Sequence, residues 1–172
     1  MSISLKASGI QFPDNSIQTT ARYGSYRNRI INGNMATAQR GISFVSPATN
    51  TYTVDRWVWV NSTAAAVTIT QQSEERTYLI GAPPYAPATP VITKSLKVQV
   101  TTADTSISTT DFAHIAQRIE GINIIDLLNN PSTLSFYIRA STTGTFCVSL
   151  RNDTGDYSYV IECEYDIANA WQ

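Results

Sequence analysis

Short segments that alternate apolar and polar residues recur along most of the chain, at intervals of about ten residues. Successive side chains of a β-strand point to opposite faces, so this alternation predicts strands with one apolar face. The predicted strands are residues 52–60, 65–71, 77–80, 95–101, 133–139, 145–151 and 158–167. Many short strands separated by turn residues, with few helices, are typical of a β-sandwich.

The composition agrees with a strand-rich chain. Serine and threonine supply 39 of the 172 residues, 42% of residues are hydrophobic, and only 15% are charged. This hydrophobic content excludes a disordered chain, and no apolar run approaches the roughly 20 residues of a spanning helix. The N-terminus also lacks the basic stretch and apolar segment of a secretory signal. We therefore expect a soluble, folded protein without Sec-dependent export or membrane insertion.

Residues 1–27 differ from the rest and are predicted to form a short N-terminal β stem. A strand with Ile10 and Phe12 on one face is followed by turn residues 13–16 and a second strand from Ile17. A lone two-stranded hairpin is marginal in water, so it must dock on the body of the chain, a symmetry mate or another protein. The expected oligomer and docking interface consists of five apolar residues: Ile3, Leu5, Ile10, Phe12 and Ile17. Residues 28–172 then form the main domain.

The net charge of −1 conceals a basic N-terminal end, because residues 1–45 sum to +4 and the remainder to −5. The only group that fits a nucleic-acid patch comprises Arg22, Tyr23, Tyr26, Arg27 and Arg29. We interpret these arginines instead as stacking or pairing within a folded or oligomeric collar. We therefore expect no nucleic-acid partner.

Residues for catalysis or metal binding are sparse. The chain has one histidine, His114, and two cysteines, without the spacing of a zinc site, a phosphate loop, a G-x-S-x-G elbow or an EF-hand. Nothing in the sequence brings together the two carboxylates that a glycosidase needs. The available carboxylates are Asp55, Asp111, Glu120, Asp126 and Glu162. We expect no catalytic residue, no metal and no cofactor.

The two cysteines lie on neighbouring predicted strands whose register follows from their apolar faces. Matching these faces across the turn at residues 153–156 pairs Phe146 with Cys163 and Val148 with Ile161. Cys147 then points to the face opposite Cys163, whereas a disulfide requires Cβ atoms about 3.5 to 4.5 Å apart. We predict two free thiols, consistent with a reducing cytosol.

Aromatic residues are the best candidates for ligand binding. Trp57 and Trp59 share one face of the strand predicted at residues 52–60. If Val58 and Val60, on the other face, point to the core, the two tryptophans form an exposed platform. If not, the tryptophans are core residues. We assign Trp57 to the core and leave both alternatives open for Trp59. Tyr78 and Tyr85 flank or lie in the proline-rich loop at residues 81–90, where they either line a shallow groove or anchor the loop. Trp59, Tyr78 and Tyr85 are thus the candidate sugar-stacking residues.

Two segments carry helical signals. Phe112, Ile115, Ala116 and Ile119 recur at helical spacing, and Gly121 follows as a stop signal, so the pattern predicts a helix. Residues 122–131 are the best candidate for a further helical turn.

Several motifs occur in an order that a known protein family shares. Residues 9–21, GIQFPDNSIQTTA, look like the F-x-D-G-T-x-Q-T-T-A segment of phage fibres, with Asn15-Ser16 where Gly-Thr is usual. Residues 28–44 and the following YTVDRWVW are similar to a family segment N-x-x-I-N-G-x-x-x-x-x-Q-R-G and its D-R-W strand. AQRIEG and TLSFYIRAS resemble two further family strands. Together these stretches resemble bacteriophage tail-fibre and related virion proteins with a jelly-roll, carbohydrate-binding-like domain.

The resemblance implies an all-β protein: the short N-terminal β stem followed by an antiparallel jelly-roll sandwich, assembled as a homotrimer. It places residues 112–120 on a strand and not a helix. It also implies assembly in the host cytoplasm, a location in the virion, and two kinds of partner besides the chain itself: other phage tail or virion proteins and a host surface glycan. The family's jelly roll continues beyond the strand that resembles residues 165–172, so we expect an open sheet edge.

Two functions compete on this basis. The first is a phage tail-fibre component that attaches to host surface polysaccharide. The second is a purely structural virion protein, such as a capsid decoration, collar or baseplate-proximal fibre protein, without glycan binding. A depolymerase would require two carboxylates facing each other across a groove, about 5 to 9.5 Å apart. Exposure of Trp59, Tyr78 and Tyr85 favours attachment, and burial at subunit contacts favours the structural function.

Overall fold

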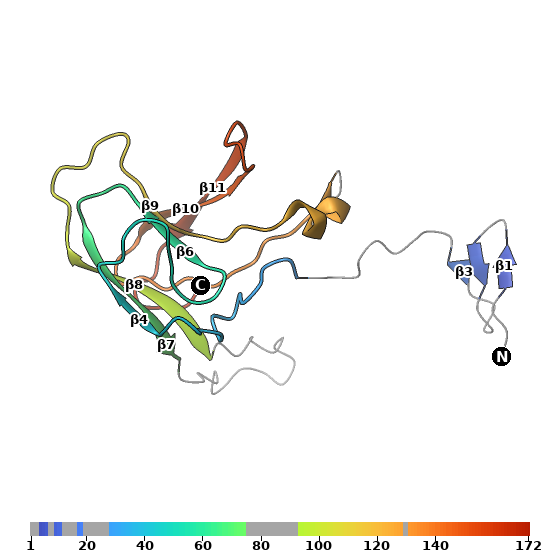
Figure 1. Ribbon diagram of the computed structural model, residues 1–172, viewed down its shortest axis with the longest axis horizontal. Coiled ribbons are helices and arrows are strands. Elements are labelled where there is room, and N and C mark those ends of the chain that lie inside the picture. Colours follow the sequence, from blue (N-terminus) through green and yellow to red (C-terminus); the bar gives the residue numbers. More distant parts are fainter. Residues whose placement is uncertain (1–3, 7–8, 12–16, 19–27, 75–92, 129–130) are drawn as a thin grey trace. The chain divides into compact units, whose positions relative to one another are not determined.

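The structure is a computed structural model that describes residues 4–6, 9–11, 17–18, 28–74, 93–128 and 131–172. Over these residues the chain is all-β: antiparallel strands and two short 3₁₀ turns make up its regular structure (Figure 1). The strands divide into three sheets of three strands and one of two. Two compact units are present, Met1–Leu128 and Asn129–Gln172. The boundary predicted between residues 27 and 28 stays a prediction.

The N-terminal strands form a three-stranded antiparallel sheet. Strands β1 (Ser4–Lys6), β2 (Gly9–Gln11) and β3 (Ile17–Gln18) follow one another in chain order. Gln11 pairs with Ile17 across the predicted hairpin, which is therefore confirmed, and Leu5 pairs with Ile10 in an additional strand.

A second sheet has the order β4-β7-β8, from β4 (Ser43–Val45), β7 (Ala66–Ser73) and β8 (Lys94–Thr102). Its register places Ile69 between Phe44 and Val98. A third sheet has the order β5-β6-β9, from β5 (Thr51–Tyr52), β6 (Val58–Asn61) and β9 (Ala113–Ala116). Strands β7 and β8 confirm the predictions at residues 65–71 and 95–101.

The second and third sheets share a hydrophobic core. Trp59 of β6 forms a buried cluster with Val67 and Ile69 of β7. Partly buried side chains from both sheets pack against this cluster: Phe44, Leu96 and Ile115. Burying a large apolar side chain contributes about 1.5 to 3 kcal/mol, so this cluster stabilises the contact between the two sheets.

The single strand predicted at residues 52–60 is wrong, because a tight turn divides it into β5 and β6. Tyr52 pairs with Val58, and the Trp57 N–H donates to the Val54 carbonyl at 3.0 Å. Arg56 takes the left-handed conformation, with φ of 74°. That conformation is uncommon for arginine, and residue alternation carries no sign of it.

The helix predicted from the spacing of Phe112, Ile115, Ala116 and Ile119 is also wrong. Residues Ala113–Ala116 form β9, where Ile115 pairs with Trp59. The strand agrees with the resemblance but ends before Gln117. The helical turn predicted at residues 122–131 corresponds to two 3₁₀ turns, Gly121–Asn123 and Ile125–Leu127.

The unit Asn129–Gln172 contains a hairpin of β10 (Gly144–Arg151) and β11 (Ser158–Tyr165). Phe146 pairs with Cys163 and Val148 with Ile161, so the predicted register is confirmed. Both cysteines are free thiols, as predicted. Tyr165 is buried, and its hydroxyl lies within hydrogen-bond distance of the Ala140 and Ala170 carbonyls, at 3.0 and 2.8 Å.

The strand predicted at residues 133–139 does not form. Ile138 exchanges two backbone hydrogen bonds with Gln172, at 3.0 and 3.1 Å, and Ala140 accepts the Asn169 N–H at 2.7 Å. No strand is assigned to the segment. The guanidinium of Arg139 lies 4.8 Å from the ring centre of Trp171.

Candidate functional site

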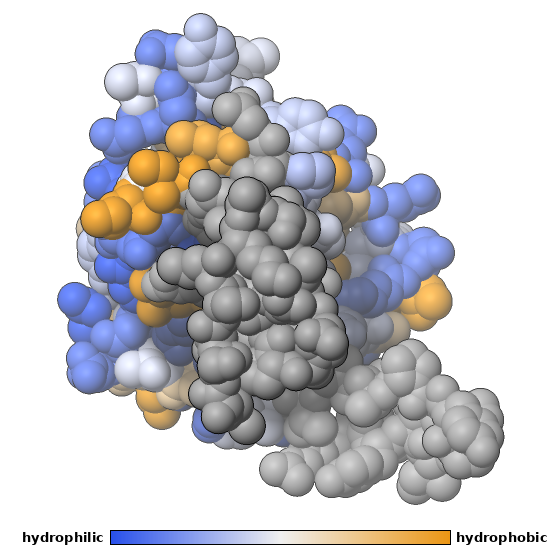
Figure 2. All heavy atoms as spheres, turned by 90° about the vertical axis from the view of Figure 1, so that its right-hand side faces the viewer, coloured by the Kyte–Doolittle hydropathy of each residue, from blue (hydrophilic) through white to orange (hydrophobic). Residues whose placement is uncertain are grey.

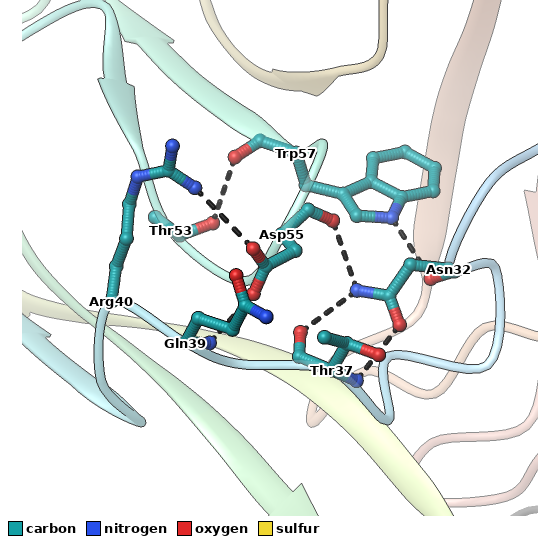
Figure 3. Close-up of polar contacts among 7 residues, drawn as sticks. All are labelled: Asn32, Thr37, Gln39, Arg40, Thr53, Asp55 and Trp57. Carbon is teal, nitrogen blue, oxygen red and sulfur yellow. Dashed lines mark hydrogen bonds and ion pairs between the residues drawn. The ribbon is translucent and has the colours of Figure 1, made fainter.

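The motif-bearing residues meet in one polar cluster (Figure 3), which we call the Asn32–Asp55 cluster: Asn32, Thr37, Gln39, Arg40, Thr53, Asp55 and Trp57. Asn32 is its centre. The Asn32 side-chain amide donates to the carbonyls of Thr37 and Asp55, both at 2.9 Å, and its oxygen accepts the Thr37 N–H at 2.9 Å. Asn32 has φ of 54°, a left-handed conformation that asparagine adopts more readily than most residues. The side chain thus joins the loop before β4 to the β5–β6 turn.

The carboxylate of Asp55 makes the second link. One oxygen accepts the Gln39 backbone N–H at 2.6 Å, and the other lies 3.5 Å from the Arg40 guanidinium (Figure 3). The same guanidinium lies 5.4 Å from the centre of the Tyr52 ring, a cation–π distance. Asp55 is therefore engaged in holding the loop.

Trp57 and Arg56 extend these ties. The Trp57 indole N–H donates to the Asn32 carbonyl at 3.1 Å, and the indole is half-buried, in agreement with its assignment to the core side. Arg56 donates to a Glu120 carboxylate oxygen at 2.6 Å and to the Arg118 carbonyl at 3.2 Å. This hydrogen bond from Arg56 is the main reason why the pKa of Glu120 falls to about 2.

Gln117 completes the connection between the motifs. Its side-chain oxygen accepts the Ile31 N–H at 2.8 Å, and its amide donates to the Ile31 carbonyl at 2.7 Å. Hydrogen bonds therefore connect three motif segments: N-x-x-I-N-G at residues 28–33, D-R-W at residues 55–57 and Q-R-I-E-G at residues 117–121. The polar groups that form these hydrogen bonds hold the loop before β4, the β5–β6 turn and the segment after β9 together.

Trp59 is not an exposed platform. Its side chain is 3% exposed and packs with Val67 and Ile69, which corrects its assignment as a sugar-stacking residue. The reason is that β6 is covered on both faces, since Val58 is also buried. Alternation along one strand cannot reveal a second covered face.

The other predicted site residues are only partly placed. Tyr78 and Tyr85 lie outside the described residues, as do Ile3 and Phe12. Leu5, Ile10 and Ile17 lie on β1, β2 and β3 respectively. The stem interface and the loop tyrosines therefore stay predictions.

The structure points to a different aromatic pair, Tyr157 and Tyr159, at the tip of the β10–β11 hairpin. Their side chains are 78% and 65% exposed. The Tyr157 carbonyl accepts the Asn152 N–H at 3.1 Å, which continues the hairpin pairing by one residue. Residues two apart on a strand share a face. Tyr159 lies on β11 and Tyr157 directly precedes this strand, so we expect both rings on one side. Tyr159 lies on the same strand face as Ile161, which is 39% exposed, and the alternation of apolar residues does not single out this pair.

The remaining chemistry-bearing residues are dispersed. His114 lies on β9 with its ring stacked on Phe112, at 5.6 Å between ring centres. Asp55 and Glu120 are each paired with an arginine, and an Asp111 carboxylate oxygen accepts the Ser108 N–H. Over the described ranges, no three His, Cys, Asp or Glu side chains gather in a way that could hold a metal ion. Nor does any helix there have the length and apolar character to span a membrane.

Comparison of the chain with protein-family models, with curated proteins and with solved structures gives no match.

Proposed function

We propose that the chain is a phage tail-fibre component that attaches to host surface polysaccharide, with a jelly-roll main domain and a trimerising N-terminal stem. The observation that carries this proposal is the exposure of Tyr157 and Tyr159 at the hairpin tip. Aromatic rings with an exposed face and a hydroxyl group suit sugar rings, which offer apolar faces and polar edges. The motif resemblance supplies the virion context.

The charge of the hairpin favours a neutral polysaccharide. Residues 144–165 contain Arg151 against four acidic residues, a net charge of −3. The acidic residues are Asp153, Asp156, Glu162 and Glu164, and all four are exposed. An acidic surface repels an acidic glycan, and salt weakens that repulsion.

Attachment in this mechanism depends on copy number. Each contact between a tyrosine ring and a sugar is weak, because we propose that the sugar binds on an open surface and not in a closed pocket. Several copies on one fibre raise the effective concentration of sites and increase avidity by orders of magnitude without new contacts. No cofactor takes part.

The experiment is binding of the full-length protein to immobilised bacterial surface polysaccharides, in one neutral and one acidic panel. We expect binding to the neutral panel, and its loss in the Tyr157→Ala/Tyr159→Ala double variant. Tyr52→Ala is the matched control. Tyr52 is 43% exposed, but the Arg40 guanidinium lies over one face of its ring, 5.4 Å from the ring centre. A Tyr78→Ala/Tyr85→Ala variant tests the loop tyrosines. Binding that survives both double variants would contradict an aromatic platform at either place.

A second candidate is a purely structural virion protein. Large apolar side chains reach the surface, and Figure 2 shows such residues in orange on the face that it presents. Ile122, Val45 and Ile107 are among the most exposed, at 83%, 75% and 74%. Such residues suit contacts with other virion proteins. Absence of glycan binding by a folded, oligomeric protein would favour this function.

A further inference from the structure

The β10–β11 hairpin has two edges of different character. In the described residues each strand pairs only with the other, so each leaves one edge free of a strand partner. The edge of β11 carries Glu162 and Glu164, whereas β10 has no charged residue from Gly144 to Leu150. Charged side chains are a common means of preventing edge-to-edge pairing. The β10 edge is therefore the one left open to another strand.

Alternate residues of β10 direct their backbone N–H and C=O groups either toward β11 or toward the outer edge, and the hydrogen bonds of the hairpin show which residues do which. The Asn152 N–H donates to the Tyr157 carbonyl, so Leu150, Val148 and Phe146 direct their backbone groups toward β11. The alternate residues, Thr145, Cys147 and Ser149, direct theirs to the outer edge. Their side chains lie on the polar face of the hairpin.

The outward backbone groups of β10 belong to residues on its polar face, and this excludes the longest described strand, β8, as an antiparallel partner. The Glu74 N–H donates to the Thr93 carbonyl, so the outward backbone groups of β8 belong to its apolar side, at Leu96 and Val98. In an antiparallel pair, the residues that exchange hydrogen bonds lie on the same face. Joining β8 to β10 would set the apolar face of one strand beside the polar face of the other. The edge of β8 also carries Lys94 and Lys97.

We propose that β10 pairs antiparallel with β10 of a second copy, about a two-fold axis at Val148. This register places Phe146 opposite Leu150 of the second copy and Cys147 opposite Ser149. Arg151, the one charged residue of β10, falls opposite Thr145, so no like charges meet. The Arg151 guanidinium occupies the space above Gly155 in the turn. An edge that is complementary to itself is the requirement for a two-fold contact.

The pairing converts two marginal hairpins into one four-stranded sheet. A two-stranded hairpin is marginal in water, and three or more strands are needed for stability. Phe146 and Leu150, which are 36% and 57% exposed, then pack across the new strand pair. Glu162 and Glu164 remain on the outermost strands. The contact is separate from the N-terminal stem and does not depend on glycan binding, but it would bring two Tyr157–Tyr159 pairs into one sheet.

A cysteine crosslink tests the register. In a Cys147→Ser/Cys163→Ser background, Val148→Cys places two thiols at a non-hydrogen-bonded pair, with Cα atoms about 4.5 Å apart, within the range for a disulfide. The matched control is Thr154→Cys in the same background, since Thr154 is exposed in the turn beyond the strands. Under mild oxidation we expect the Val148→Cys protein to form covalent dimers about tenfold faster or more. Equal rates for the two variants would overturn the proposal.

A proline substitution tests the edge without a crosslink. Ser149→Pro removes an outward N–H that the hairpin itself does not use, and proline is tolerated at strand edges. Light scattering of the full-length protein should give half the parent mass, because two copies, or two stem trimers, no longer associate through β10, with an unchanged circular dichroism spectrum. An unchanged mass would overturn the proposal and leave the edge to another segment. If this variant does not fold, the crosslinking rates decide.

Discussion

Replacing Asn32 by aspartate tests whether the Asn32–Asp55 cluster holds the loop to the sheet. The introduced carboxylate would keep the oxygen that accepts the Thr37 N–H but lose both amide donors. The carbonyls of Thr37 and Asp55 would then face a carboxylate oxygen in place of an N–H group. The change leaves the size of the side chain and its tolerance of a left-handed backbone nearly unchanged.

The expected cost follows from the two lost hydrogen bonds. Each contributes about 1 kcal/mol net, and a carboxylate held against two carbonyls adds a further penalty, for a total of about 3 kcal/mol. For a protein of this size, each kcal/mol lowers the melting temperature by about 2 to 4 °C. We therefore expect the melting temperature to fall by about 6 to 12 °C.

Asn34→Asp is the matched control. The Asn34 side-chain oxygen accepts the Ala36 N–H at 3.3 Å, a bond that aspartate preserves. Urea and thermal unfolding, followed by circular dichroism at neutral pH, should show a large loss of stability for Asn32→Asp and a change under about 0.5 kcal/mol for Asn34→Asp. Equal stability of the two variants would refute the role assigned to Asn32.

Other substitutions probe the core, the turns and the ion pair. Trp59→Ala should lower the unfolding free energy by about 3 to 5 kcal/mol, because the side chain is buried. Trp57→Phe should lower it by about 1 kcal/mol, because one hydrogen bond is lost. Similar losses for both variants would contradict the assignment of Trp59 to the core. Gly155 has φ of 79° and lies under Arg151, so Gly155→Ala should destabilise the hairpin unit by about 1 to 2 kcal/mol, measured by hydrogen exchange; unchanged protection would argue against strain there. The pKa of Glu120 is lowered to about 2, so its ion pair stabilises the folded state above the ordinary pKa of 4.5, and that contribution is lost as pH falls toward 2. The melting temperature of Glu120→Gln should consequently fall less than that of the parent between about pH 5 and pH 2, and parallel curves would disprove this linkage.

Sequence reasoning succeeded where one face of a strand decides the structure. The register that pairs Phe146 with Cys163 follows from matching two apolar faces across a short turn. The N-terminal hairpin follows from turn residues between apolar ones. In both cases the determining interactions are local in the chain.

Sequence reasoning failed where contacts distant in sequence override local pattern. The left-handed Arg56 that divides β5 from β6 bonds to Arg118 and Glu120, which lie far later in the chain. Trp59 is buried because a second sheet covers it. This outcome is not encoded in the alternation of β6.

The attachment proposal is tested most directly by mapping the tyrosines that a polysaccharide protects. Oxidative footprinting with mass spectrometry would compare the full-length protein with and without saturating neutral polysaccharide. We predict reduced modification at Tyr157 and Tyr159, with Tyr52 and Tyr137 unchanged as internal references of similar exposure to each other, at 43% and 49%. Protection confined to other residues, or no protection at a concentration where the protein is bound, would contradict the account.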